Sequence, residues 1–297
     1  MNDTKDIPEK HHRDFLKTVA LSAAGLAAAA LHPSPRVAHA SAAKPFAGDV
    51  LRVWSCGGLA EGMMPANAAY ESLQNISITY TGAFAAALGK SLLSNGRTDV
   101  FAGRVLELAQ KLRSAGRMVS FKPFCFTRYV IVTPSGNPGK IGALEDLAKP
   151  GVRVAMAPNA SPPGGAAVTG ILKLSGLTEA IMKNVMDQEA TCVQTTLQDV
   201  VKRHADAMIV ELRLTRMDRF RSQLDVIPIP EEFFPPGPLT FTIGLMEEAK
   251  NVALAKNYID WMTSADGGQK FMEEAGFIPA ESDEGRRLIE KLGVRDE

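Results

Sequence analysis

The chain is poor in the side chains that catalytic and metal sites commonly use. Its 297 residues include only three cysteines, Cys56, Cys125 and Cys192, and five histidines, of which only His204 lies beyond residue 40. A Ser-His-Asp triad or a multi-histidine metal site would therefore depend on a single histidine. Because the number of cysteines is odd, at most one disulfide can form within the chain. The sequence thus disfavours both a Ser-His-Asp triad and a multi-histidine metal site.

The chain also lacks net charge and long apolar runs. Its 33 basic residues balance 33 acidic ones, and residues 41–297 carry a formal net charge of −1. No broad basic face is implied, so we do not expect a nucleic acid partner. The apolar run over residues 18–31 is shorter than a membrane-spanning helix requires, which argues against a permanent membrane anchor.

Residues 1–40 have the pattern of an export signal. A polar, partly basic segment around Arg13 leads into the alanine-rich run, and Ala38-His39-Ala40 fits the small-x-small cleavage rule. We expect cleavage near Ala40 and a periplasmic or otherwise exported protein that begins at Ser41. The basic segment resembles a twin-arginine signal with His12 in place of the first arginine, so the sequence leaves the Sec and Tat routes open.

From Val50 onward, short β-branched or apolar runs alternate with helical patterns. Strands are expected over residues 50–55, 76–81, 99–102, 128–133, 152–157, 207–211, 226–229 and 240–245, and helices over 59–73, 85–93, 105–115, 165–174, 195–204 and 250–262. This alternation predicts an α/β fold with mixed, mostly parallel sheets.

Two places in the chain look like crossings between lobes. An apolar strand leaves the first region at 124–127, and the segment 228–238 carries five prolines in eleven residues, too many for the interior of a sheet. If the chain goes out once and returns once, residues 41–127 plus 236–297 form lobe 1 and residues 128–235 form lobe 2. Two lobes joined by a two-strand hinge enclose a cleft that can close on a ligand.

The turn after the first predicted strand is rich in glycine. In VLRVWSCGGLAEG, residues 50–62, a strand passes through Ser55-Cys56-Gly57-Gly58 into a helix. The first N–H groups of such a helix have no partner within it and point at whatever lies beyond the strand end, which suits an anion. Glycine is also ordinary in the first βα loop of an α/β domain, but similar turns recur at Gly82 and at Gly164-Gly165.

Several segments in order resemble the molybdate-binding family of ABC importers over nearly the whole exported chain. They are WSCGGLAEGM, TYTGAFAAALGKSLLSNGRTDVFAG, RYVIVTPSGNP, LEDLAKPGVRVAMAPNASPPGGAAVTGIL, DAMIVE, TFTIGLM and GFIPA. The resemblance implies a type II periplasmic solute-binding fold and a molybdate- or tungstate-like oxyanion held between the lobes by helix N-termini and hydroxyls. It further implies delivery to an ABC permease in the inner membrane, a monomer, no cofactor and no enzymatic activity.

At the site itself the sequence departs from the family. The family's serines of the first and second loops fall on Gly58 and about Ala85, and its second-lobe tyrosine on about Val210, so three hydroxyl donors are absent. Each lost hydrogen bond weighs about 0.5–1.5 kcal/mol, and Ser55 and Thr81 are candidate replacements. The identity and affinity of the ligand therefore stay open. The expected contacts are Ser55, Cys56, Gly57, Gly58, Thr81, Gly82, Ala83, Ala85, Pro163, Gly164, Cys192, Val193 and Glu211.

Glu211 is an unusual member of this set, because a carboxylate facing an anion pocket repels the ligand unless an arginine neutralises it. Four arginines follow it, at 213, 216, 219 and 221, and their spacing favours a solvated, self-paired helix face. Arg128, at the first crossing, is the better candidate for a pocket cation.

The three cysteines support an alternative function. If Cys56, Cys125 and Cys192 face one cleft, their thiolates suit a soft metal or metalloid better than an oxyanion. Free cysteines are also ordinary small core residues, and these spacings match no metal motif. Two further alternatives are an enzyme that uses a cysteine such as Cys56 on the same fold, and a sensory module that reports a ligand to a membrane partner.

Overall fold

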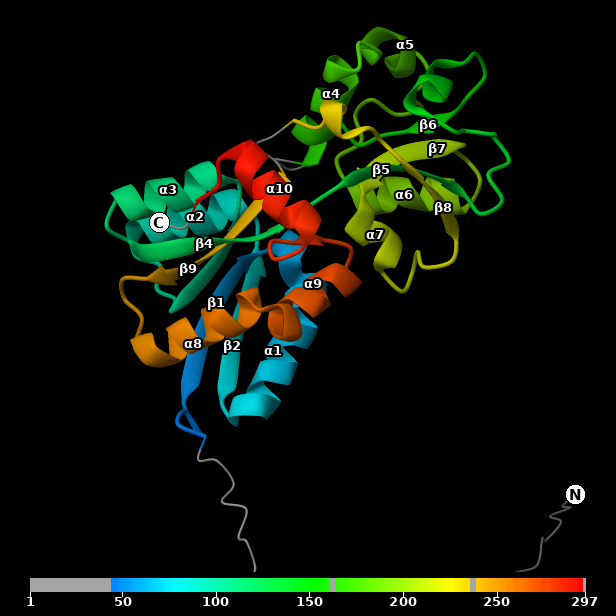
Figure 1. Cartoon of the computed structure of the whole chain (residues 1–297). Helices are drawn as coiled ribbons and strands as arrows, with labels where there is room; N and C mark the ends of the chain where they lie inside the picture. Colours follow the sequence, from blue (N-terminus) through cyan, green and yellow to red (C-terminus); the bar gives the residue numbers. More distant parts are fainter. Residues whose placement is uncertain (1–43, 161–163, 236–238, 296–297) are drawn as a thin grey trace, which may run out of the picture. The chain divides into compact units, whose positions relative to one another are not determined.

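Two β-sheets organise the computed structural model, which describes residues 44–160, 164–235 and 239–295. The predicted export signal and Pro163 lie outside these residues. The first sheet has six strands in the order β10-β4-β9-β3-β1-β2, and the second has four in the order β6-β7-β5-β8 (Figure 1). The strands of the first are β1 (Val50–Cys56), β2 (Ser77–Ala83), β3 (Val100–Arg104), β4 (Met118–Phe126), β9 (Thr240–Met246) and β10 (Ile278–Pro279). Those of the second are β5 (Tyr129–Pro134), β6 (Val154–Ala155), β7 (Ala207–Glu211) and β8 (Leu224–Pro228).

Both sheets are mixed, as predicted, but the prediction that they are mostly parallel is wrong. Strand β1 pairs in parallel with β2 and β3, and β6 with β7. The other five pairings between these named strands are antiparallel. An apolar run in the sequence shows where a strand lies but not its direction. Strand β4 leads out of the first sheet and β9 leads back into it beside β4, so these two strands run in opposite directions.

Helices cover both faces of each sheet. Those beside the first are α1 (Ala60–Gln74), α2 (Ala85–Ser94), α3 (Leu106–Ser114), α8 (Val252–Thr263), α9 (Lys270–Glu274) and α10 (Asp283–Leu292). Those beside the second are α4 (Gly164–Leu174), α5 (Thr178–Met182), α6 (Val193–Val201) and α7 (Leu212–Arg216). The predicted helices agree with these bounds to within a few residues, whereas the sequence pattern gave no expectation of α5, α9 or α10.

Five apolar clusters pack these helices against the sheets, and the smallest of them holds α10 against β4 and β10. In the first sheet, Val53 packs toward α1 and α8, while Phe101 packs on the opposite face toward α2 and α3. In the second, Ile131 faces α4 and α5, while Val132 faces α6. The alternation of side chains along each strand therefore supplies a separate core on each face. Burial of apolar area at about 25 cal/mol per Å² is the main stabilising contribution of such cores.

The chain crosses from one sheet to the other at two adjacent places. Only Thr127 and Arg128 separate β4 from β5, and the return leads directly into β9. The backbone N–H of Thr127 donates to the carbonyl of Leu239 at 2.9 Å, and Phe126 pairs with Thr240. The outgoing and returning segments are thus hydrogen-bonded to each other. The exact division of the chain into two lobes stays a prediction.

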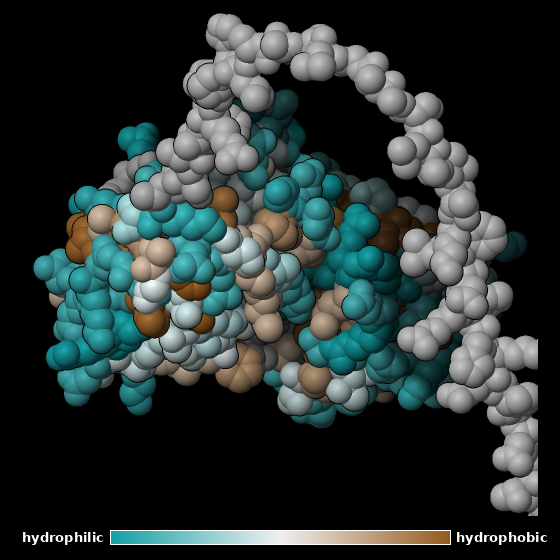
Figure 2. All heavy atoms as spheres, turned by 90° about the horizontal axis from the view of Figure 1, so that it is seen from below, coloured by the Kyte–Doolittle hydropathy of each residue, from teal (hydrophilic) through white to brown (hydrophobic). Residues whose placement is uncertain are grey.

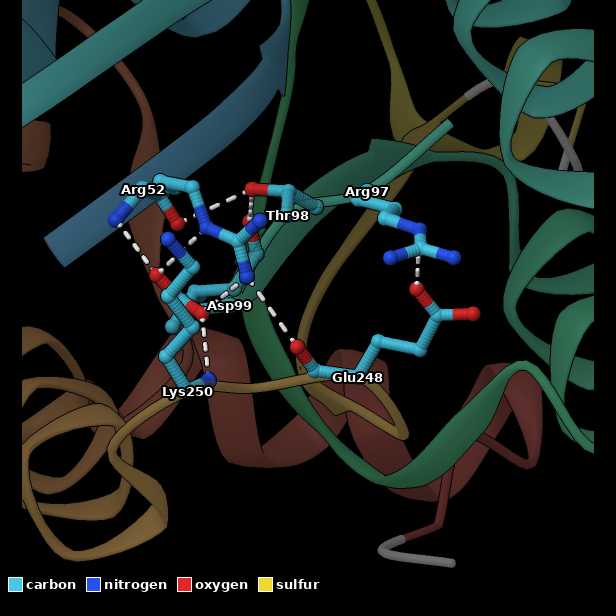
Figure 3. A network of polar contacts seen from close by, with 7 residues as sticks. Arg52, Arg97, Thr98, Asp99, Glu248 and Lys250 are labelled. Carbon is cyan, nitrogen blue, oxygen red and sulfur yellow. Dashed lines mark hydrogen bonds and ion pairs between the residues drawn. The ribbon is translucent and has the colours of Figure 1, made fainter. Parts of the chain in front are cut away.

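A buried carboxylate ties together three neighbouring strands of the first sheet, β1, β3 and β9 (Figure 3). Asp99, 1% exposed, accepts hydrogen bonds from the backbone N–H of Arg52 at 2.7 Å, from its guanidinium at 2.6 Å and from the backbone N–H of Lys250 at 2.8 Å. The same guanidinium donates to the carbonyl of Glu248 at 3.0 Å. Asp99 thereby joins β1, the start of β3 and the loop after β9.

The outer surface is largely polar on the face that Figure 2 shows, where hydrophilic side chains predominate and hydrophobic patches are small. Among the helices of residues 44–295 that the structure describes, none combines the length and the apolar character needed to cross a membrane.

Candidate functional site

A cavity of about 790 Å³ lies between the elements of the two sheets. On the side of the first sheet, the wall is formed by residues of β1, β2, β3, α1 and α2. On the side of the second sheet, it is formed by residues of β5, β7, α4, α6 and α7. The lining residues are Cys56, Gly57, Gly58, Glu61, Gly82, Ala83, Phe84, Ala85, Arg104, Tyr129, Ala157, Ala160, Gly164, Val168, Thr191, Cys192, Val193, Gln194, Met208, Ile209, Val210, Glu211, Arg213 and Leu214.

Three helices begin on the wall of this cavity. Ala85, Gly164 and Val193 are the first residues of α2, α4 and α6, and all three line it. The first N–H groups of a helix lack partners inside it and carry the positive end of the helix dipole. At α2 the preceding residue, Phe84, provides no side-chain cap. The arrangement therefore turns several backbone donors from both sheets toward one space.

The start of α4 requires a glycine for steric reasons. A Cβ atom at Gly165 would lie 2.2 Å from the carbonyl oxygen of Pro158, closer than real Cβ contacts allow. By contrast, a Cβ at Gly164 would meet no atom within 4 Å. Gly165 thus allows α4 to pack closely against the segment around Pro158, whereas Gly164 borders open space in the cavity.

Four charged side chains form an alternating chain of ion pairs in the wall. Glu211, at the end of β7, lies 2.6 Å from Arg104 at the end of β3 and 2.5 Å from Arg213 in α7. Arg213 also lies 3.0 Å from Glu61 in the first turn of α1. Arg104 and Glu61 come from the first sheet's half, and Glu211 and Arg213 from the second's. The pairs Arg104–Glu211 and Arg213–Glu61 therefore connect the two halves.

Burial and charge act against each other on Glu211. Its side chain is 5% exposed, and burial alone would raise the pKa of its carboxyl. The charges of Arg104 and Arg213 outweigh that effect and lower the pKa to about 2. The hydroxyl of Tyr129 donates a further hydrogen bond to the carboxylate at 3.1 Å. Glu211 is thus ionised at neutral pH, and with Glu61 it balances the two arginines.

Arginines neutralise the carboxylate of Glu211, as the sequence analysis required. They are Arg104 and Arg213, however, and not Arg128, which the sequence favoured. Arg213 does not belong to a solvated, self-paired helix face. It is the second residue of α7, close to the end of β7, and its largely buried side chain bonds Glu211 and Glu61. Arg128 does not line the cavity and instead pairs with Glu284. Arg104 was missed by sequence reasoning, although its place at the end of a fully buried strand is a usable signal.

Most predicted contact residues do lie together. Ten of them line the cavity: Cys56, Gly57, Gly58, Gly82, Ala83, Ala85, Gly164, Cys192, Val193 and Glu211. The two candidate replacement hydroxyls, Ser55 and Thr81, do not. The Ser55 side chain is buried and bonds the hydroxyl of Tyr80 at 2.5 Å, because side chains alternate along β1 and the neighbouring residue takes the cavity side. Sequence reasoning missed Glu61, Phe84, Arg104 and Tyr129.

The three cysteines are free and do not meet at one place. Cys56 and Cys192 line the cavity, whereas Cys125 is fully buried in the core beside β9 and β10. Among the residues that the structure describes, no group of three cysteine, histidine or acidic side chains is arranged to hold a metal ion. The structure therefore does not assemble the three-thiol site of the alternative hypothesis.

The cysteines are expected to differ strongly in reactivity, because the thiolate is the reactive form. Cys192 is exposed, and a hydrogen bond from the hydroxyl of Thr195 lowers the pKa of its thiol. Burial raises the pKa of Cys56 and Cys125. We expect a thiol reagent such as a maleimide to label about one group of the native protein rapidly at pH 7.5. The variant Cys192→Ser should lose this fast phase, and a fast phase that persists in it would contradict the assignment.

Comparison with known proteins agrees with this architecture. A family described as bacterial extracellular solute-binding protein matches residues 51–278. The molybdate-binding protein ModA of Mycobacterium bovis is 25% identical over 210 residues, which span 68% of this chain and 74% of that protein. The substrate binding domain of a putative molybdenum ABC transporter from Clostridium difficile has a TM-score of 0.69 at 20% identity and covers 79% of this chain and 100% of that chain. The periplasmic molybdate-binding protein of Azotobacter vinelandii has a TM-score of 0.61 at 16% identity and covers 77% of this chain and 98% of that chain.

These findings confirm the resemblance inferred from the sequence and the fold class that it implied. The matched family and the similar proteins bind solutes and are not enzymes. Members of such families capture a small ligand and hand it to a membrane permease. The match covers most of the chain, including nearly all of both sheets and every residue that lines the cavity. The chain therefore belongs to the bacterial extracellular solute-binding proteins, with the two-lobed α/β fold of the type II periplasmic binding proteins.

Proposed function

We propose that this protein is exported, captures a small oxyanion in the cavity between its sheets and presents it to an ABC permease. The observation that carries the proposal is the convergence of the first residues of α2, α4 and α6 on one cavity. The N-termini of helices beside both sheets supply hydrogen-bond donors and partial positive charge without a dedicated basic side chain. The names of the relatives make molybdate the first candidate, and tungstate has the same tetrahedral dianionic form.

The proposed mechanism is binding followed by closure, with no bond made or broken. The lobes are residues 41–127 plus 236–297 and residues 128–235, and the adjacent crossings near Thr127 and Leu239 act as the hinge. Residues 1–40 act as the export signal, cleaved near Ala40. The backbone around Gly57, Gly58, Gly82, Ala83, Ala85, Gly164 and Val193 provides the anion contacts, flanked by Cys56, Cys192 and the neutralised Glu211.

A charge placed at Gly164 tests the proposal. A side chain there meets open space, and an acidic residue in the first turn of a helix is compatible with folding. We expect Gly164→Asp to weaken oxyanion binding at least tenfold by repulsion. The variant Gly164→Asn has the same size without the charge and should bind within about threefold of the parent.

The measurement is thermal unfolding with molybdate, tungstate, sulfate, a series of carboxylates and, as a neutral control, acetamide. A ligand at 100 times its dissociation constant stabilises the folded state by about 2.7 kcal/mol. Saturable stabilisation by at least one oxyanion, lost in Gly164→Asp and retained in Gly164→Asn, supports anion capture at this cavity. Stabilisation by none of these oxyanions, or an equal response of both variants, would refute it.

A further inference from the structure

The cavity is large for a bare tetrahedral ion. Liquid water occupies about 30 Å³ per molecule, so 790 Å³ has room for roughly 25 water-sized groups. A tetrahedral oxyanion consists of a central atom and four oxygens. Pockets of about 300–1,000 Å³ are typical of sites for organic small molecules. An inorganic ion bound at the helix starts would fill only a small part of this space before the lobes close.

Much of the cavity wall is apolar and offers an inorganic ion no hydrogen bond. Phe84 stands immediately before α2, lines the cavity and leaves 68% of its surface exposed. Ala157, Ala160, Val168 and Val210 are further apolar residues that line the cavity. Apolar surface stabilises a complex only when apolar surface of the ligand covers it. An exposed phenyl ring at the mouth of the predicted site therefore points to a ligand with a hydrocarbon part.

The charges in the wall favour a singly charged ligand. Among the described lining residues, Arg104 and Arg213 are balanced by Glu61 and Glu211, and the pairs lie at 2.5–3.0 Å. What remains for the ligand is the partial charge of the helix ends, roughly half an elementary charge each. The three helix starts together supply less than two positive charges, so they neutralise a monoanion fully and a dianion only in part.

One acceptor in the wall is unused by the protein. Within the described part of the chain, Oε2 of Glu61 is buried and accepts no hydrogen bond, while its Oε1 binds Arg213 at 3.0 Å. A buried carboxylate oxygen without a donor is unfavourable. Because this oxygen has almost no accessible surface, the carboxylate must turn toward the cavity to accept a hydrogen bond from a hydroxyl or ammonium group of a ligand.

We infer that the ligand of this cleft is an organic monoanion, a small carboxylic acid with an apolar body and a hydroxyl or amino donor, rather than a free inorganic dianion. The inference rests on the proposed function, which places an oxyanion at the helix starts. The carboxylate of the ligand binds at the helix starts, and its apolar body lies against Phe84 and the alanine and valine residues of the wall. Its hydroxyl or amino group donates to Glu61.

The test measures dissociation constants of the purified protein for acetate, butanoate, hexanoate, 2-hydroxyhexanoate, molybdate and tungstate by calorimetry. Each methylene that becomes buried is expected to increase affinity about three- to fourfold. We expect hexanoate to bind at least tenfold more tightly than acetate, and 2-hydroxyhexanoate at least threefold more tightly than hexanoate.

Two variants locate the effect in the cavity. Phe84→Ala should weaken hexanoate at least tenfold and leave acetate within twofold, and it should fold because the ring is mostly exposed. Leu73→Ala removes a comparably exposed apolar side chain outside the cavity and should change neither constant.

The outcomes separate this inference from the proposed function. Tight, saturable binding of molybdate or tungstate with no binding of the acids would overturn the inference and leave oxyanion capture standing. Affinity independent of chain length, or of the 2-hydroxyl group, would also overturn it. Binding of none of these anions would overturn both the inference and the proposed function.

Discussion

Replacing Glu211 by glutamine is expected to lower the free energy of unfolding at pH 7 by about 3 kcal/mol. The amide preserves the shape but leaves Arg104 and Arg213 without their shared counter-charge in a buried site, and breaking a buried ion pair typically costs about 3–5 kcal/mol. Urea denaturation measures the change. For a domain of this size, about 2–4 °C of melting temperature corresponds to each kcal/mol.

The effect of this substitution should depend on pH in a defined direction. The pKa of Glu211 falls from its ordinary value of 4.5 to about 2 in the folded protein. Its contribution to stability is therefore complete above about pH 4.5 and is lost as the pH falls toward 2. The difference between the parent and Glu211→Gln should shrink by about half or more between pH 7 and pH 3.

A matched substitution distinguishes this effect from the general loss of a carboxylate. Glu247, which is exposed and does not line the cavity, is changed to glutamine in the control, and stability should stay within about 0.5 kcal/mol. A loss below 1 kcal/mol for Glu211→Gln, or a difference that persists unchanged to pH 3, would show that the ion pairs are not a stabilising link between the two halves.

Replacing Asp99 by alanine is expected to destabilise the protein by about 4 kcal/mol. The substitution removes hydrogen bonds to two backbone N–H groups and to the guanidinium of Arg52, all centred on a carboxylate that is almost fully buried (Figure 3). Each buried donor left without a partner costs about 1–3 kcal/mol, and hydrogen bonds to charged groups are among the stronger ones. Chemical denaturation of the purified variant measures the loss.

Asp260 is the matched control for Asp99. It also pairs with a basic side chain, Lys122 at 2.8 Å, but 66% of its side chain is exposed. Exposed ion pairs contribute about 0–1 kcal/mol, so Asp260→Ala should change stability by less than 1 kcal/mol. Burial would raise the pKa of Asp99, but its bonds with Arg52 lower it overall, so the gap between the two variants should narrow as the pH falls. Equal losses for the two variants would contradict the role given to Asp99.

Local features of the chain were the easiest to predict. Strand β7 has the predicted bounds, and α2 begins at the predicted Ala85, because an apolar run or a helical period is a property of neighbouring residues. The short β6 and β10 give too little pattern to be read well. The crossing after β4 was found because an apolar strand ends there, whereas strand direction was mispredicted because periodicity carries no direction.

The sequence by itself determined the alternation of strands and helices, the family resemblance and the glycine-marked turns from which α1, α2 and α4 start, since all of these depend on residues adjacent in the chain. Only the tertiary structure decided which side chains face the cavity. Glu61, Arg104 and Glu211 are separated by up to 150 residues and meet because two sheets bring their strand and helix ends together. Tertiary packing also places the side chain of Phe84 in the cavity wall and that of Ser55 in the core, because the orientation of a side chain depends on packing against distant elements.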